Sequence, residues 1–582
     1  MGTLLATLAA AALTSCTKKT DEKDNTLNVV LKANVKGLDP MSANDLYSST
    51  VIEQMFEGLL QYSYLKRPFQ LEPALADGMP TVSADGLVHT FKIKSGVRFQ
   101  DDPCFKDGKG RELEADDFVY SWRRLADPSN LSDGFWIFKD KVKGFNEWAK
   151  AIKEGKADYS TTIEGFRMPD KRTLVITLVK PYYQLDYVLA MPFSMVVPKE
   201  AVAKYGKEFL NHPVGTGPYQ LESWIRNSKI VMKRNPTWRG ANYPTEGDPG
   251  DREAGLLEDA GKPMPFADRL VMTELVEDSP RWQNFQKGNF DFAEIPADAF
   301  ENAVKNKKVV PALEERGVKL HVKSGDDTTY AAFNMKDPIL GKNKDLRHAI
   351  ALAQDVPTFI RNFYNGRATA AQSPIPPDFA SYDAAFVNPW QRHDIEKAKE
   401  LLAKAGYPGG KGLAPLNYET LSDSKSRQQA ELFVQDVAKI GIKAVIIANT
   451  WPQHQEKIKS QKAQIFAIAW AADYSDPQNF YQLFYTKNMT PGPNDSNFSN
   501  AGFDALYEQS LTLAPGPERN ALYVKLRDIL VDEAPWMFIG HREIYRTYFS
   551  WLHNFKPNDL AKGWMMYLRV DPKARAEMKP KL

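Results

Sequence analysis

A carboxylate between aromatic side chains is the clearest candidate for ligand chemistry in this chain. Ile465–Trp470 is a short apolar run rich in strand formers, and it predicts a buried strand. The segment Asp473–Pro477 follows and combines Asp, Ser and Pro, which favour turns. We therefore expect Asp473 at the mouth of the strand, flanked by Trp470 and Tyr474.

Two roles are open to Asp473. A carboxylate held among aromatic rings is a good receptor for one ammonium group, because charge-assisted pairing strengthens as water is excluded. The same side chain could instead cap the turn or helix that follows, where Phe480, Leu483 and Phe484 recur at helical spacing. The local pattern favours the cap over the receptor.

The composition is that of a globular protein. A chain of 582 residues can bury a large core in a few domains, and 43% hydrophobic with 25% charged residues is ordinary. The formal charge of +2 comes from 75 basic and 73 acidic residues, so nucleic acid is not an expected partner. Aromatic residues reach 12%, a generous supply for lining a binding cleft.

The sequence contains none of the common catalytic or metal-binding motifs. It lacks Gly-x-x-x-x-Gly-Lys-Ser/Thr, His-Glu-x-x-His and Gly-x-Ser-x-Gly, and its eight histidines have no ligand spacing. Cys104 follows Pro103, with no feature that would activate its thiol. We expect no enzyme activity, no cofactor and no metal site. Because the other cysteine, Cys16, lies in the leader, no disulfide is expected.

The first 25 residues have the pattern of an export signal and a tether. Leu4–Leu13 is an apolar run too short to span a bilayer, and Leu13-Thr14-Ser15-Cys16 resembles the lipobox of bacterial lipoproteins. No Lys or Arg precedes the run, so either the true start lies upstream or the free amino group supplies the charge. We expect lipidation at Cys16 and anchoring to the extracytoplasmic or periplasmic face of a bacterial membrane. The alternative is a cytoplasmic protein with an apolar tail.

Periodicity predicts strands that alternate with helices, and therefore an α/β class with more than one sheet. A helix is predicted over Val51–Leu60, and another from Asp117 to Arg124 with Asp116 as its cap. Arg239–Pro265 is rich in Gly, Pro and acid and predicts a surface loop. Further strands are predicted at Thr26–Leu31, His89–Ile93, Lys229–Lys233, Gly317–Lys323, Leu416–Leu421 and Ala444–Ile447, and further helices at Lys344–Ala353, Ile395–Ala405 and Arg427–Ile440.

A collinear series of short motifs resembles a known family. The motifs include GLDP, EGLL, DGLVHTFKIKSGVRF, ADDFVYSWRRLADP, VGTGPY, KRNP, KAKELLAKAGY, WAADY and DEAP, and they cover nearly the whole mature chain. Each motif is weak, but their order is specific. The chain resembles the extracytoplasmic solute-binding proteins of ABC importers, in the branch that takes oligopeptides, dipeptides, nickel complexes and opines.

The resemblance implies a two-lobed periplasmic-binding-protein fold of type II, a Venus flytrap with an extra subdomain inserted in the first lobe. The implied boundaries are 1–25 for the signal and tether, 60–199 for the inserted subdomain and 325–534 for lobe II, which carries Asp473. Lobe I combines 26–59, 200–324 and 535–582. Ligands of this fold bind in the cleft between the lobes.

The resemblance also assigns roles to single residues. In the peptide-binding members, the Asp of Trp-x-x-Asp pairs with the α-ammonium of the peptide, and Asp473 with Trp470 matches this motif. This match moves the expectation for Asp473 from cap to receptor. The other implied ligand-binding residues are Tyr474 beside it, Trp451 in a side-chain pocket, Asn44, Asp45 and Leu46 pairing with the peptide main chain, Phe135 or Trp136 at the amino end, and Lys425 at a carboxylate.

One departure concerns the carboxyl end of the ligand. Oligopeptide binders carry basic residues at two positions that are Ala467 and Ile458 here, so Lys425 is the single cation where several are expected. A buried carboxylate without a partner is costly, so the length or class of the ligand differs.

We expect a lipid-anchored monomer that captures extended peptides and delivers them to a permease in the cytoplasmic membrane. The alternatives are a non-peptide solute such as a metal chelate, an opine or a sugar, or a surface lipoprotein that acts as a chaperone or receptor for a protein partner through Arg239–Pro265.

Overall fold

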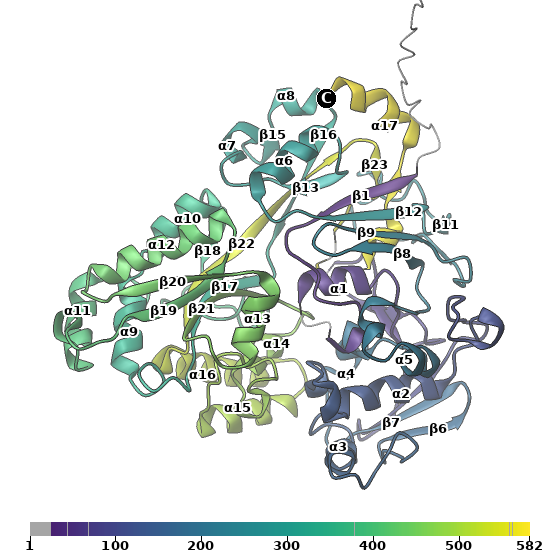
Figure 1. The fold of residues 1–582 in the computed structure, drawn as a ribbon, viewed down its shortest axis with the longest axis horizontal. Helices are drawn as coiled ribbons and strands as arrows, with labels where there is room; N and C mark the ends of the chain where they lie inside the picture. The colour runs from purple at the N-terminus through teal and green to yellow at the C-terminus, as the bar shows by residue number, and fades with distance from the viewer. Residues whose placement is uncertain (1–24, 43–44, 68, 378, 558, 562) are drawn as a thin grey trace, which may run out of the picture.

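The computed structural model describes residues 25–42, 45–67, 69–377, 379–557, 559–561 and 563–582. Strands and helices alternate through these residues and form two bodies that lie side by side (Figure 1). We call lobe I the body that contains the first strand and the last helix, and lobe II the body on the left in Figure 1, coloured mainly green. The predicted α/β class is confirmed.

Lobe I is organised on a four-stranded sheet. Its strands are β1 (Thr26–Leu31), β12 (Arg269–Glu274), β9 (Lys229–Arg234) and β8 (Tyr219–Ile225), in the order β1-β12-β9-β8. β1 runs parallel to β12 and alternates half-buried with buried residues. Since successive side chains of a strand point to opposite faces, Leu27, Val29 and Leu31 enter the core.

Helix α1 (Leu46–Ile52) crosses close to this sheet and is capped by Asp45. The predicted helix over Val51–Leu60 is wrong beyond Ile52, because Leu60 already belongs to strand β2 (Leu60–Tyr62), which pairs with β3 (Leu71–Pro73). The apolar residues between them are buried in loop conformation, so their spacing indicated burial rather than a continuous helix.

The blue part of lobe I, at the lower right of Figure 1, is a subdomain with its own sheet. Helix α2 has its N-cap at Glu114, not at the predicted Asp116. Glu114 and Asp117 form a capping box, in which the Asp117 carboxylate accepts a hydrogen bond from the Glu114 N–H group at 2.9 Å. The elements are β4 (Thr81–Val82), β5 (Val88–Lys92), β6 (Phe166–Asp170), β7 (Thr173–Thr177), α2 (Ala115–Ala126), α3 (Phe145–Lys153), α4 (Leu185–Val188) and, beside them, α5 (Lys199–Tyr205).

Lobe II surrounds a mixed sheet with helices. Its central strands are β17 (Asp327–Phe333), β21 (Ile465–Ala471), β19 (Leu416–Leu421) and β20 (Ala444–Asn449), in that order. β19 runs parallel to both β20 and β21. The helices are α9 (Lys344–Ala353), α10 (Val356–Tyr364), α11 (Ile395–Lys404), α12 (Ser424–Ala438), α13 (Trp451–Lys459), α14 (Gln478–Tyr481), α15 (Ala501–Leu511) and α16 (Pro517–Glu533).

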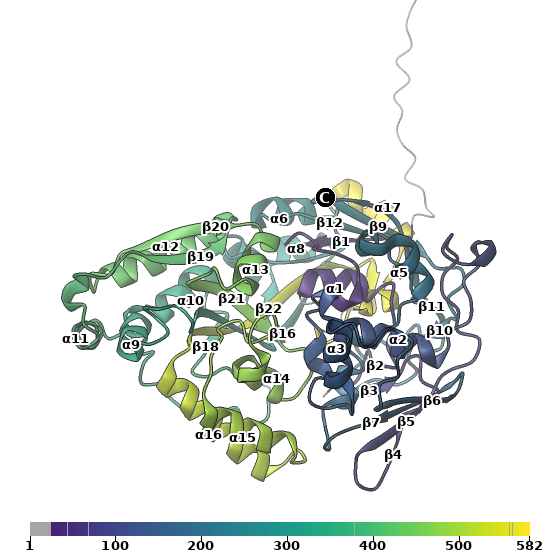
Figure 2. The ribbon, with the colours of Figure 1, turned by 60° about the horizontal axis from the view of Figure 1, so that its bottom comes forward.

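One long strand, β22 (Trp536–Phe549), joins the two lobes. It pairs with β17 and β18 (Ala368–Ala370) in lobe II, and then with β16 (Val318–Ser324) and β13 (Phe292–Glu294) on the lobe I side. Figure 2 shows β22 running through the centre of the molecule, between the lobes. The strand pairing of β22 changes from lobe II to the lobe I side near His541–Glu543. The lobe boundaries implied by the resemblance stay a prediction.

The acid-rich segment 239–265 packs against the carboxyl-terminal part of the chain. Its Asp251 is buried and accepts hydrogen bonds from Lys556 Nζ at 2.8 Å, and its fully buried Asp259 pairs with Arg569 at 2.6 Å. Two short strands, β10 (Ala241–Asn242) and β11 (Pro263–Met264), close its base. Several of the acidic residues that made this segment a candidate surface for a protein partner therefore hold it against the rest of lobe I instead.

Candidate ligand-binding site

Two adjoining cavities lie between the lobes. One has a volume of about 310 Å³ and is lined by Asp473, and the other, of about 240 Å³, is lined by Lys425. We call them the Asp473 cavity and the Lys425 cavity. They form one continuous cleft, because they share the lining residues Leu46, Tyr47, Tyr364, Ala471 and Arg542.

Asp473 follows the end of β21 and is held beside Trp470 by one amide. Asn479 Oδ1 accepts hydrogen bonds from the backbone N–H of Asp473 at 3.0 Å and from the indole N–H of Trp470 at 2.9 Å. Asn479 Nδ2 donates to Asp473 Oδ2 at 3.2 Å. The fully buried Asn479 thus fixes the carboxylate and the indole relative to each other. Sequence reasoning missed this residue, because an Asn in the first turn of a predicted helix carries no specific signal.

The capping role that competed with the receptor role is filled by Asp476. Its Oδ1 accepts a hydrogen bond from the backbone N–H of Gln478 at 2.9 Å, where α14 begins. Its Oδ2 accepts from Arg519 at 2.7 Å and from Gln184, the residue before α4, at 3.4 Å. The turn after β21 therefore directs Asp476 into the packing between lobes, and Asp473 into the cleft.

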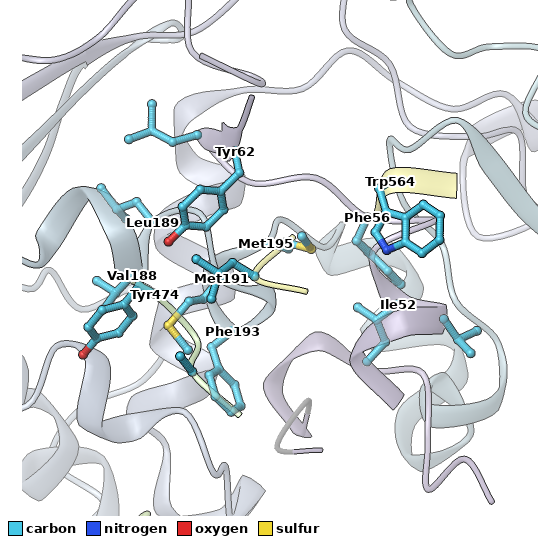
Figure 3. Close-up of a cluster of buried hydrophobic side chains, with 14 of the residues drawn as sticks. Ile52, Phe56, Tyr62, Val188, Leu189, Met191, Phe193, Met195, Tyr474 and Trp564 are labelled. Carbon is cyan, nitrogen blue, oxygen red and sulfur yellow. The ribbon is translucent and has the colours of Figure 1, made fainter. Parts of the chain in front are cut away.

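Tyr474 lies away from the cleft. Its side chain is fully buried and its ring stacks on that of Tyr187, with the centroids 5.6 Å apart. Figure 3 shows it in an apolar cluster with Val188, Leu189 and Met191. Adjacent residues of a turn point in different directions. Tyr474 therefore does not line the cavity that Asp473 lines, although the two are neighbours in the sequence.

The walls of the Asp473 cavity are aromatic. Trp451, the first residue of α13, packs edge-to-face against Tyr47 of α1 with ring centroids 6.3 Å apart. Trp136 also lines this cavity, whereas Phe135 stacks on Phe145 inside the subdomain, 5.5 Å between centroids. Of the two alternatives at the amino end, the structure brings Trp136 to the cleft. The remaining aromatic residues of this wall are Phe193, Tyr364 and Trp470.

The segment after Pro40 reaches the same cavity. Asp45 is buried, and its Oδ1 accepts hydrogen bonds from the N–H groups of Tyr47 at 3.0 Å and Ser48 at 2.9 Å. Leu46 is the first residue of α1 and lines both cavities with a 43% exposed side chain. Asn44 lies outside the described residues, as does Cys16.

The Lys425 cavity gathers basic residues from distant parts of the chain. Lys425 lies at the start of α12, with its ammonium 5.4 Å from the centre of the Tyr364 ring. Burial, followed by the positive charges of Lys32 and Arg542, lowers the pKa of Lys425 to about 8. Among the described residues, no carboxylate lies within ion-pair distance of Lys425 or of Arg367, another residue of this lining.

The expectation of a single cation at this end is wrong. Lys32, Arg367, Arg542 and Arg546 line the cavity together with Lys425. Lys32 pairs with Glu294, Arg542 with Asp327 and Arg546 with Asp559. The sequence hides this cluster, because it forms only when β22 and the end of β1 meet across the cleft. One signal was available: Arg542 and Arg546 lie on one face of a strand.

No helix in the described part of the chain is both long enough and apolar enough to cross a membrane. Within the same residues, no group of three His, Cys, Asp or Glu side chains gathers around a point where a metal ion could sit.

Comparisons with known proteins agree on the family. The model of the bacterial extracellular solute-binding proteins, family 5, matches residues 70–491. Heme-binding protein A of Haemophilus influenzae is 28% identical over 505 residues, which cover 84% of this chain and 82% of that protein. The glutathione-binding protein GsiB of Escherichia coli O1:K1 is 27% identical over 542 residues and covers 91% of each chain.

Solved structures share the fold. The periplasmic binding protein DppA of Helicobacter pylori, in complex with the peptide STSA, superposes with a TM-score of 0.77 at 23% identity, covering 94% of this chain and 98% of that one. The two-lobed type II fold expected from the sequence motifs is therefore confirmed.

Proposed function

The chain belongs to the bacterial extracellular solute-binding proteins of family 5, and from this premise we propose that it captures extended peptides between its lobes for delivery to an ABC permease. The observation that carries the proposal is a difference between the two cavities: four aspartates, Asp473 among them, line one, whereas in the other Lys425 and Arg367 have no carboxylate at ion-pair distance among the described residues. Asp473 lines one and Lys425 the other, inside one continuous cleft. A free peptide has one positive and one negative end, so it matches this arrangement in one direction.

At the amine end, Asp473 receives the α-ammonium of the peptide. Asn479 holds the carboxylate in position before the ligand arrives, which reduces the entropy lost on binding. The neighbouring indoles exclude water and strengthen the charge pair.

At the other end, Lys425 receives a carboxylate of the ligand. Its low pKa reflects burial among like charges, and a bound anion relieves both effects. Arg542 and Arg546 are already paired with aspartates, so they shape the cavity and add to its field rather than supply free charge.

The relatives support a peptide more than other solutes. GsiB is named for glutathione, which is itself a tripeptide, and the DppA structure holds a tetrapeptide. Heme-binding protein A is named for a ligand of another class. Glutathione and haem therefore belong in the test beside ordinary peptides.

The test is a thermal shift assay with matched peptide pools. A pool of free di- to pentapeptides is expected to raise the melting temperature, and the same pool with acetylated amines is expected to leave it unchanged. Asp473→Asn should remove the shift, whereas Asp298→Asn, an exposed aspartate outside both cavities, should retain it. A shift by haem with none by any peptide would contradict the proposal, as would an equal shift by acetylated peptides.

Anchoring and delivery complete the proposed role. Lipidation at Cys16 would hold the protein at the extracytoplasmic face of the membrane, where a monomer can dock on its permease. Cys16→Ser should move the protein from the membrane fraction to the soluble fraction of a fractionated cell. Retention in the membrane would argue against this anchor. The proposal involves binding without chemistry, so no catalytic residue is assigned.

A further inference from the structure

The amine end of the cleft offers more hydrogen-bond acceptors than one ammonium group needs. Asp45 is 6% exposed and uses Oδ1 to cap α1, while its buried Oδ2 has no hydrogen-bond partner among the described residues. Burial raises the pKa of Asp45, and hydrogen bonds donated by Ser48 offset part of this rise. This carboxylate lines the Asp473 cavity. A buried acceptor without a donor is costly unless a ligand supplies one.

A second acceptor faces the same cavity from the other lobe. Gln455 is 8% exposed, and its buried Oε1 also has no partner in the described part of the chain. It lies on α13 one turn after Trp451, so both side chains project from the same face of the helix. Asp45 and Gln455 thus contribute acceptors from α1 of lobe I and α13 of lobe II.

The charges around this space leave a negative excess. Asp133 lies 3.6 Å from Lys36, a lysine whose side chain is 37% exposed, and such a pair contributes little. Asp495 lies 2.8 Å from Lys459, and burial and the neighbouring Asp133 raise the pKa of Asp495. The charge of Lys36 also lowers the pKa of Asp45. Lys36 and Lys459 therefore stand against three carboxylates, those of Asp45, Asp133 and Asp495. Asp473 is a further carboxylate of this cavity.

The aromatic wall suits the stem of a basic side chain. Trp136 and Trp451 line the space, and Phe193 adds a third ring. Such rings pack against the methylene stem of lysine or arginine, and their faces attract the charged head.

We propose that Asp45, Asp133 and Gln455 form a second cation-binding position beside Asp473, so that the preferred peptide begins with a residue whose side chain is basic. The inference rests on the proposed function and specifies its ligand. The α-ammonium pairs with Asp473, and the side chain of the same residue extends along Trp451 toward Asp45. A neutral first residue leaves the Asp45 and Gln455 acceptors unsatisfied in the closed cleft.

Isothermal titration with four tripeptides tests the inference: Lys-Ala-Ala, norleucine-Ala-Ala, Ala-Lys-Ala and N-acetyl-Lys-Ala-Ala. Norleucine keeps the stem of lysine and removes its charge. We expect Lys-Ala-Ala to bind at least tenfold more tightly than norleucine-Ala-Ala, with no comparable gain for Ala-Lys-Ala. Asp45→Asn should reduce the preference while retaining a residue that caps a helix. Asp133→Asn, outside any helix start, is the second variant, and Asp298→Asn is the matched control.

The outcomes separate this inference from the proposed function. Equal affinity for the lysine and norleucine peptides, with no binding of N-acetyl-Lys-Ala-Ala, would overturn the second position and leave Asp473 as the amine receptor. An unchanged preference in both Asp45→Asn and Asp133→Asn would overturn the assignment of these residues. Failure of every tripeptide to bind would overturn the inference together with the proposed function.

Discussion

In the Asp473 cavity carboxylates outnumber the lysines beside them, whereas in the Lys425 cavity two cations, Lys425 and Arg367, have no carboxylate at ion-pair distance among the described residues. Both cavities are buried between the same lobes and share part of their lining. The difference in charge along one cleft gives it a direction. A zwitterionic ligand is favoured in one orientation and opposed in the other.

The two cavities also differ in how their charges are held. Asp473 is fixed by local hydrogen bonds, from an amide only six residues away. The positive charge of Lys425 is disfavoured by burial and by the charges of Lys32, which follows β1, and Arg542 of β22. The acidic end is thus prepared for a cation by contacts that stabilise the carboxylate. The basic end stores an unfavourable charge that a bound anion would relieve.

Reversing the charge at the acidic end should have the largest effect. Asp473→Lys places a cation where the α-ammonium binds, so we expect the affinity for a free tripeptide to fall roughly a hundredfold or more. Isothermal titration measures this loss, with Asp298→Lys as the control. A loss below threefold would show that the two ends do not differ as proposed.

Removing the charge at the basic end should have a smaller effect. Lys425→Met keeps most of the side-chain volume and should weaken binding of a tripeptide with a free carboxylate about tenfold. The same variant should bind the amidated tripeptide as tightly as the unmodified protein does. If amidated and free peptides lose affinity equally, Lys425 contributes packing rather than charge.

The pH dependence of binding should report the same lysine. Only the protonated amine attracts a carboxylate, and the pKa of Lys425 in the free protein is about 8. A bound anion raises that pKa, so affinity should be constant below pH 8 and fall above it by up to about tenfold per pH unit. The decline should be shallower in Lys425→Met but not absent, because the α-ammonium that pairs with Asp473 also loses its proton near pH 8. Affinity that rises from pH 8 to pH 9 would have the wrong sign for this account.

The smallest effect concerns the ligand-free protein. A lysine whose folded pKa lies below its unfolded value costs stability at pH 7, because folding disfavours its charged form. Lys425→Met should therefore increase the free energy of unfolding by about 1 kcal/mol and raise the melting temperature slightly. A lower melting temperature would show that the amine has a stabilising contact in solution.

Local features of the sequence predicted much of the fold. Strands Thr26–Leu31 and Leu416–Leu421 and helix Lys344–Ala353 have the predicted bounds, because each combines clear periodicity with turn residues at its ends. The α2 cap was misplaced by two residues, since Glu114, Asp116 and Asp117 are all acidic and only the geometry shows which pair forms the box. The order of short motifs predicted the two-lobed architecture.

The site was predictable only where its residues are close in sequence. Trp470 and Asp473 form a short motif and lie together, held by Asn479. Lys32, Arg367 and Arg542 come from three distant segments, and no local pattern joins them. The orientation of Tyr474 was equally hidden, because it depends on Tyr187 of another subdomain. Long-range strand pairing therefore carries the information that the sequence pattern lacks.

The most direct test of the two-ended cleft is a titration of one tripeptide in its free, amine-acetylated and carboxyl-amidated forms against three proteins. These are the unmodified chain, Asp473→Asn and Lys425→Met. We predict that acetylation weakens binding to the unmodified chain and to Lys425→Met, but causes no further loss in Asp473→Asn. Amidation should weaken binding to the unmodified chain and to Asp473→Asn, but cause no further loss in Lys425→Met. If the effect of acetylation depends on Lys425, or if neither block changes the affinity, the cleft does not distinguish the two ends of its ligand as proposed.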